Sequence, residues 1–181
     1  MLLDGFTPQD GDAFATGTHG SSADTFATSF LPALPPGLLW ERNYDPGGLT
    51  LNVHADSDGD GIPDYWETAH FGGPTAADAS AFASNNVMTV REAYLADLDP
   101  ADPDAIFVIT AIVLEDGVPR IHWRGGVNAV QTLYRAETLV NVTNAPAAIR
   151  IVTPPTPVEN NLPDADAADR PSAFYWLEAE R

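Results

Sequence analysis

Five carboxylates fall within one twelve-residue stretch, residues 56–67, which reads DSDGDGIPDYWE. Their spacing matches the side-chain ligand positions 1, 3, 5, 9 and 12 of a calcium loop. Calcium takes about six to eight oxygen ligands, and alternate side chains of a tightly wound loop converge on one point. Gly61 holds position 6, where the chain must turn sharply, and Ile62 at position 7 would offer its backbone carbonyl. The sequence therefore predicts a Ca²⁺ site formed by Asp56, Asp58, Asp60, Ile62, Asp64 and Glu67.

The individual positions of this loop suggest different modes of binding. Glu67 is long enough to chelate with both oxygens, whereas Asp64 at position 9 could bind through a water. Mg²⁺ suits the site less well, because it prefers few carboxylates and keeps its waters. The remaining alternative is an acidic, solvated turn that binds no ion.

Two features separate the loop from a calcium sensor of the EF-hand type. A β-strand is expected before the loop, where an EF-hand has a helix. Pro63 stands at position 8 and lacks the N–H through which two such loops pair. We therefore expect no opening of a helix pair on calcium binding.

Charge points to the same region. Residues 56–104 hold eleven acidic residues and one basic residue, Arg91, a net charge of −10 out of −18 for the chain. Like charges at this density repel and resist compaction, so a cation is expected to neutralise them.

The overall composition excludes several classes of function. The chain has 181 residues, 26 of them acidic and 8 basic, and its pI of about 4.1 argues against nucleic acid or an anionic membrane surface as a partner. It has no Cys, which excludes disulfides, thiolate metal sites and a Cys nucleophile. No apolar run approaches the roughly 20 residues that span a bilayer, so membrane insertion is not expected.

The elements before the loop read as short β-strands. Leu49, Leu51 and Val53 alternate with polar residues, which is the period of a half-buried strand. Aromatic-containing stretches around Phe14, Phe26 and Trp40 are separated by turn signals, and no helix is expected there. Glu41 and Glu137 lie in β regions and are expected to be exposed.

Two short helices are predicted after the loop. Residues 65–71 contain no Gly or Pro and end at Gly72-Gly73-Pro74. Residues 89–96 place apolar side chains on one face, and Thr89 with Glu92 forms a capping-box pattern.

The rest of the chain returns to β-structure. An apolar run at 106–114 precedes the hairpin signal Asp116-Gly117, and a strand containing Ile121 and Trp123 follows. Further strands are predicted at 130–135, 148–152 and 174–178, whereas the Pro- and Asp-rich stretch 154–171 is predicted to be a surface loop. These strands suggest a small β-sandwich of the fibronectin III or immunoglobulin type.

The central segment resembles a known family. DSDGDGIPDYWE, then FGGPTAAD, then TVREAYLADLDPADPDAIF, is similar to the bacterial thrombospondin type 3 and dockerin-like calcium modules of large secreted proteins. Such modules usually carry a second acidic loop. Here its positions 1, 3, 5, 9 and 12 are degenerate, being Phe82, Ser84, Asn86, Val90 and Ala93. The resemblance implies one good site, and it leaves open whether Ser84, Asn86, Glu92 or Asp78 assists an ion.

The flanks show weaker resemblances. LLDGFTPQDGDAFAT and FLPALPPGLLWERNYDPGGLTLNV are similar to the ends of autotransporter-like β-solenoid passengers. IHWRGG, LYRAETL and FYWLEAER resemble small β-sandwich domains that close secreted bacterial proteins. The implied organisation is a solenoid end or short β-sheet at 1–54, a two-helix calcium module at 55–104 and a β-sandwich at 105–181.

These observations predict a structural role and no enzymatic activity. The expected protein is secreted or attached to the cell surface, with a secretion signal outside this chain, because residues 1–4 are too short and too acidic for one. Calcium would stiffen the junction between the β regions. The alternatives are a module that recognises a protein or a polysaccharide, and the non-catalytic tail of an extracellular enzyme. The four His residues are scattered, and no nucleophile motif accompanies them.

Overall fold

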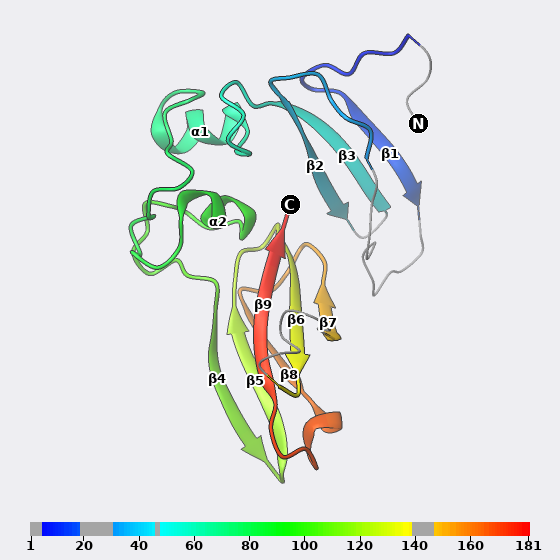
Figure 1. Cartoon of the computed structure of the whole chain (residues 1–181), viewed down its shortest axis with the longest axis vertical. Coiled ribbons are helices and arrows are strands. Elements are labelled where there is room, and N and C mark those ends of the chain that lie inside the picture. The colour runs from blue at the N-terminus through cyan, green and yellow to red at the C-terminus, as the bar shows by residue number, and fades with distance from the viewer. Residues whose placement is uncertain (1–4, 19–30, 46–47, 139–146) are drawn as a thin grey trace.

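The computed structural model describes residues 5–18, 31–45, 48–138 and 147–181, so the prediction around Phe26 lies outside the described residues. The described chain is mainly β, with three small antiparallel sheets and two short α-helices (Figure 1). The helices lie to one side of the junction between the first sheet and the other two, with α1 beside the first sheet (Figure 1).

The first sheet has the order β1-β3-β2 and contains β1 (Ala13–Thr18), β2 (Leu38–Asp45) and β3 (Gly48–Ala55). β3 is the strand that the alternation of Leu49, Leu51 and Val53 predicts. Tyr44 and Leu49 form a buried cluster with Val130 of a later strand. Glu41 pairs with Asn52 in the register of β2 and β3. Because side chains alternate along a strand, these two lie on the face of the sheet opposite to Tyr44 and Leu49.

The two predicted helices are present as α1 (Asp64–Phe71) and α2 (Val90–Leu95). Gly72 ends α1 in the left-handed conformation, at φ 84°, and its N–H donates to the carbonyl of Thr68. Thr89 and Glu92 form the predicted capping box at the start of α2. The two helices and the acidic loop share one buried cluster of Ile62, Trp66, Val90 and Tyr94.

The remaining strands form two three-stranded sheets. One has the order β4-β5-β8 and contains β4 (Val108–Glu115), β5 (Val118–Arg124) and β8 (Glu159–Pro163). The other has the order β7-β6-β9 and contains β6 (Val130–Ala136), β7 (Ala147–Val152) and β9 (Phe174–Glu180). Asp116 and Gly117 both adopt positive φ, as a tight hairpin turn between β4 and β5 requires.

One apolar core lies among the strands of these two sheets. Ile121, Trp123 and Leu133 form its buried centre. The partly buried side chains around them come from both sheets or from the segment that enters β4, and they are Phe107, Ile109, Ile149, Val152, Leu162, Tyr175 and Leu177.

The prediction of a surface loop over residues 154–171 is wrong in part. β8 pairs with β5 within this stretch, and a single 3₁₀ turn, η1 (Ala165–Ala167), follows it. The polar sequence ENNLP carries little strand signal, and the strand is stabilised by its pairing with β5 and by the packing of Leu162 against the core. β8 is an edge strand, where Asn and Pro are tolerated because one side of the ladder is unpaired.

Candidate metal centre

The acidic loop directly follows β3 and is wound by its own backbone. Asp56 is buried, and its carboxylate accepts the N–H of Gly59 at 2.9 Å and that of Gly61 at 3.2 Å. Gly59 and Gly61 adopt φ values of 74° and 86°, a region that side chains disfavour. The loop therefore closes around the carboxylate of Asp56.

Three of the predicted ligands come together. One carboxylate oxygen from each of Asp56, Asp58 and Asp60 lies within 4.8 Å of the others. Burial and the negative charges of Asp58 and Asp56 raise the pKa of Asp60. The folded loop thus holds carboxylates close together against their repulsion, and oxygen ligands in this arrangement suit a divalent cation.

Glu67 supplies the most specific observation. Its side chain is fully buried, at 0% exposure, in the first turn of α1. One oxygen, Oε1, accepts the N–H of Ala77 at 2.9 Å, whereas Oε2 is buried without a hydrogen-bond partner in the described part of the chain. Burial raises the pKa of Glu67, and the charges of Asp58, Asp60 and Asp64 raise it further. An unpaired buried acceptor costs about 1–3 kcal/mol, which a cation ligated at Oε2 would offset.

Asp64 and Ile62 have other roles in the described structure. Asp64 lies outside the three-acid cluster, because its Oδ1 accepts the N–H of Ser57 at 2.8 Å and its Oδ2 accepts the Ser57 hydroxyl at 2.6 Å. These bonds tie position 9 of the loop to position 2. The Ile62 side chain is fully buried against Trp66, so it anchors the loop to the helices.

The second, degenerate loop gathers no comparable group among the described residues. Asp78 accepts hydrogen bonds from Ser80, and Glu92 is engaged in the cap of α2. The Asn86 side chain donates to the backbone carbonyl of Ser84. Of the residues left open as helpers of an ion, Asp78 and Glu92 are thus engaged in local hydrogen bonds.

Arg91 packs against the acidic loop, a contact that the spacing of the acidic residues did not predict. A Cβ atom added at Gly61 would lie 2.8 Å from Nε of Arg91, so this side chain packs directly on the loop. Its charge favours the ionised form of Asp60, against the effect of burial and of the other acids. The signal in the sequence was that Arg91 is the one base in the acidic segment.

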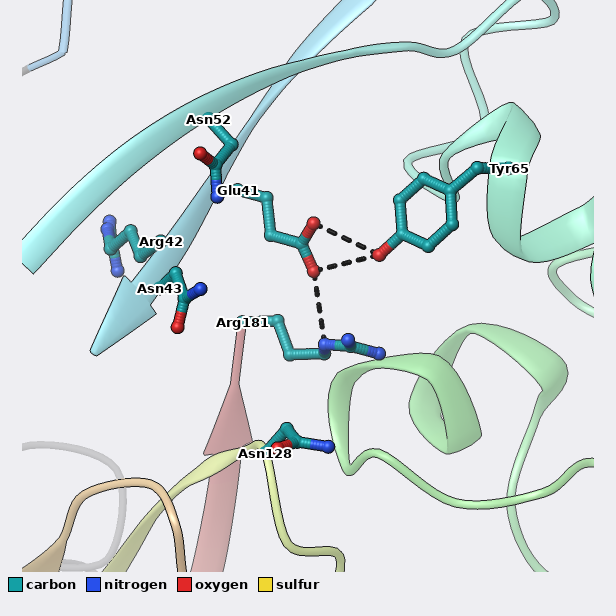
Figure 2. A pocket seen from close by; sticks show the side chains of 7 residues that line it. All are labelled: Glu41, Arg42, Asn43, Asn52, Tyr65, Asn128 and Arg181. Carbon is teal, nitrogen blue, oxygen red and sulfur yellow. Dashed lines mark hydrogen bonds and ion pairs between the residues drawn. The ribbon is translucent and has the colours of Figure 1, made fainter. Parts of the chain in front are cut away.

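A second polar cluster joins the loop's helix to the flanking sheets (Figure 2). Glu41 is buried, at 7% exposure, so the prediction that it is exposed is wrong. Its carboxylate accepts the Tyr65 hydroxyl at 3.0 Å and lies 2.9 Å from Nε2 of His54 and 3.1 Å from Nε of Arg181. Burial by itself would raise the pKa of Glu41, but the hydrogen bond from His54 and the charge of Arg181 outweigh it and lower the pKa.

Arg181 also reaches α2. Its guanidinium carbon lies 5.1 Å from the ring centre of Tyr94, and its NH1 lies 3.4 Å from the carboxylate of Asp97. The other oxygen of Asp97 accepts the backbone N–H groups of Val127 and Asn128. These polar contacts therefore join the end of α2 to the loop before β6 and to Arg181 after β9.

Comparison with family models, with curated proteins and with solved structures finds no match to this chain. The resemblance to thrombospondin type 3 and dockerin-like modules therefore stays a prediction. No helix among the described residues is long and apolar enough to cross a membrane.

Proposed function

We propose that this chain is a calcium-binding structural module of a secreted or cell-surface bacterial protein, and that the ion stiffens the junction between β regions. The observation that carries the proposal is the buried, unpartnered Oε2 of Glu67, at loop position 12, near enough to Asp58 and Asp60 for their charges to raise its pKa. Secretion and the bacterial source rest on the family resemblance alone.

Calcium would be held by Asp56, Asp58, Asp60 and Glu67, with the Ile62 carbonyl as a backbone ligand and Asp64 acting through a water or through Ser57. The ion would neutralise carboxylates that otherwise repel one another. It would also tie the loop to the first turn of α1, since Glu67 belongs to that helix. Extracellular modules of this kind bind calcium at about 10⁻⁴–10⁻³ M, which extracellular calcium can saturate.

Contacts made by α1 would extend the effect of calcium from the loop to the neighbouring sheets. Tyr65 lies on the same helix as Glu67, and its hydroxyl donates to Glu41 on β2. Glu41 in turn contacts Arg181, which follows β9. Fixing α1 by calcium would therefore fix the contact between the first sheet and the last strand.

The proposal includes a β-sandwich for the C-terminal sheets and a terminal cap for the first sheet. The common core of the two C-terminal sheets supports a β-sandwich. The first sheet is antiparallel throughout, which suits a terminal cap better than a coil of the parallel strands that make a β-solenoid.

Recognition through aromatic stacking on the C-terminal sheets receives less support. The rings of Tyr134 and Trp176 are stacked with their centres 5.3 Å apart, so each ring covers one face of the other. Trp123 is buried. Dockerin-like pairing would need a second acidic loop, and the corresponding positions in this chain hold no acidic residue.

The test is a thermal melt in excess EGTA and again with millimolar calcium. Millimolar calcium is about ten times a dissociation constant of about 10⁻⁴ M and stabilises by about 1.4 kcal/mol. For a chain of this length we therefore expect a rise in Tm of about 3–6 °C. The variant Asp56→Asn, Asp60→Asn should lose this rise. The control variant Asp166→Asn, Asp169→Asn removes the same amount of charge at two exposed positions and should keep the calcium-dependent rise in Tm.

Glu67→Gln sharpens the test, because it removes a charge and little volume. Since burial raises the pKa of Glu67, the ionised side chain destabilises the ion-free fold. The variant should therefore melt higher than wild type in EGTA and gain little from calcium. Absence of any calcium response in the wild type, or an equal response in the Asp56/Asp60 variant, would overturn the proposal.

A further inference from the structure

A small pocket lies where the first sheet, α1 and the end of β9 meet (Figure 2). Its volume is about 230 Å³, and it is partly open to solvent. Glu41, Arg42 and Asn43 line it from β2, and Asn52 from β3. The rest of the lining comes from Tyr65, Asn128 and Arg181. Ligand sites commonly occur at such junctions between structural units.

The charges that line the pocket are already compensated. Arg42 NH1 lies 2.7 Å from Glu180, so this guanidinium is held by a carboxylate outside the pocket lining. Arg181 contacts both Glu41 and Asp97. An anionic ligand would compete with these carboxylates for the guanidinium groups, and a cationic ligand would displace an arginine from Glu41. The electrostatics thus favour a neutral ligand.

The amides in the lining have unused hydrogen-bonding capacity. The side chains of Asn43 and Asn52 have no hydrogen-bond partner among the described residues, and each offers two donors and one acceptor oxygen. Asn128, which also lines the pocket, donates a side-chain N–H to Asp97 and keeps its amide oxygen as a further acceptor. Groups that both donate and accept match hydroxyls, which do the same.

Tyr65 lines the pocket from α1, and Figure 2 shows the Glu41 side chain between its ring and the amides of Asn43 and Asn52. Its hydroxyl is fixed by Glu41, while the residue remains 44% exposed. The ring is therefore held in place at the edge of the pocket, with part of its surface open. The exposed part of this ring can contact C–H groups of a ligand whose hydroxyls are bound by the amides across the pocket.

We propose that this pocket binds one neutral sugar residue. Its volume is below the roughly 300 Å³ at which sites for drug-sized ligands begin, so it admits a single ring, and any further residues of a polysaccharide would extend through the open side. The proposal stands on the pocket alone and does not require that the acidic loop binds calcium.

The test is ligand-observed saturation-transfer NMR on the intact chain in millimolar calcium. The probes are glucose, galactose, mannose and N-acetylglucosamine, with acetate as the anionic comparison. We expect at least one sugar to bind with a dissociation constant in the range of about 1 mM. Loss of one hydrogen bond should weaken binding about five- to tenfold in Asn43→Ala and in Asn52→Ala. Asn161→Ala, on β8 of another sheet, should bind as wild type does.

Asn43 is exposed, so Asn43→Ala is expected to fold normally, and an unchanged melting temperature checks this for each variant. The inference is overturned if no sugar of the panel binds. It is also overturned if acetate alone binds, or if the Asn43 variant binds sugar as tightly as Asn161→Ala. Sugar binding without a calcium response would sustain this inference while refuting the proposed calcium role.

Discussion

Single carboxylates in this protein behave according to their surroundings. Glu67 and Glu41 are both buried, yet burial and neighbouring acids raise the pKa of the first, and His54 and Arg181 lower that of the second. The two pKa values shift in opposite directions because the carboxylates have different neighbours: a buried carboxylate is stable as an anion only beside hydrogen-bond donors or cations. Glu67 is thus suited to receive a cation, whereas Glu41 already has one.

The lowered pKa of Glu41 predicts a pH dependence of stability. A depressed folded-state pKa contributes stability above the unfolded-state value of 4.5 and loses it as pH falls through the folded-state pKa. Glu41→Gln should therefore be less stable than wild type by about 1–3 kcal/mol at neutral pH. The gap should shrink as pH is lowered from about 6 to about 3. Urea unfolding at several pH values, with Glu159→Gln as an exposed control, measures it. A gap that stays constant with pH would contradict the assignment.

The short elements depend on contacts beyond their own sequence. α2 spans Val90–Leu95, and a helix this short is unstable by itself in water. Its start is secured locally by the capping box, but its end is secured by the loop before β6. There the N–H of Gly126 donates to the carbonyl of Ala96 at 3.1 Å, and Asp97 accepts the N–H of Asn128.

Gly126 is the position where this contact leaves no room. A Cβ atom there would lie 2.2 Å from the backbone oxygen of Asp97, and backbone cannot move as a side-chain tip can. Gly126→Ala should destabilise by at least about 1–3 kcal/mol, the usual cost of overpacking. The matched control is Gly73→Ala, whose added Cβ meets nothing closer than 3.6 Å. Chemical denaturation in calcium compares the two, and equal stability of both variants would show that the end of α2 is not fixed by this loop.

In the described part of the chain, the first sheet meets the other two through a small apolar cluster and a few ion pairs. Val130 packs with Tyr44 and Leu49 across the junction, and Arg42 pairs with Glu180 nearby. The helical segment, residues 56–104, joins these β regions and carries −10 of the chain's net charge of −18. We therefore expect that neutralising this charge makes the first sheet, the helical segment and the C-terminal sheets unfold together.

Scanning calorimetry can test this cooperativity. With calcium we expect one unfolding transition, because the loop, α1 and the Glu41–Arg181 contact are fixed together. In EGTA we expect the transition to broaden or to split in two as the parts unfold separately. The double variant Tyr65→Phe, Arg181→Ala should split even with calcium, whereas Arg150→Ala on β7 should not. A single sharp transition for wild type in EGTA would show that the junction does not depend on the ion.

The features that sequence reasoning predicted are those governed by near neighbours. The acidic loop, the Asp116-Gly117 turn, the capping box and the alternation in β3 each depend on residues within about one turn or a few strand positions. For such features the local backbone preference and the side-chain spacing are sufficient. The cluster of Asp56, Asp58 and Asp60 belongs to this class.

Only the tertiary structure decided the burial of Glu41, the packing of Arg91 on Gly61, the role of Gly126 and the pairing of β8. In each case the partner lies far along the chain, as Arg181 does from Glu41. Nothing in the types of these residues specifies their partners, because long-range contacts are set by how whole faces pack. The amino-acid sequence by itself thus determined where a cation could bind, and the packing of the sheets decided what that binding would hold in place.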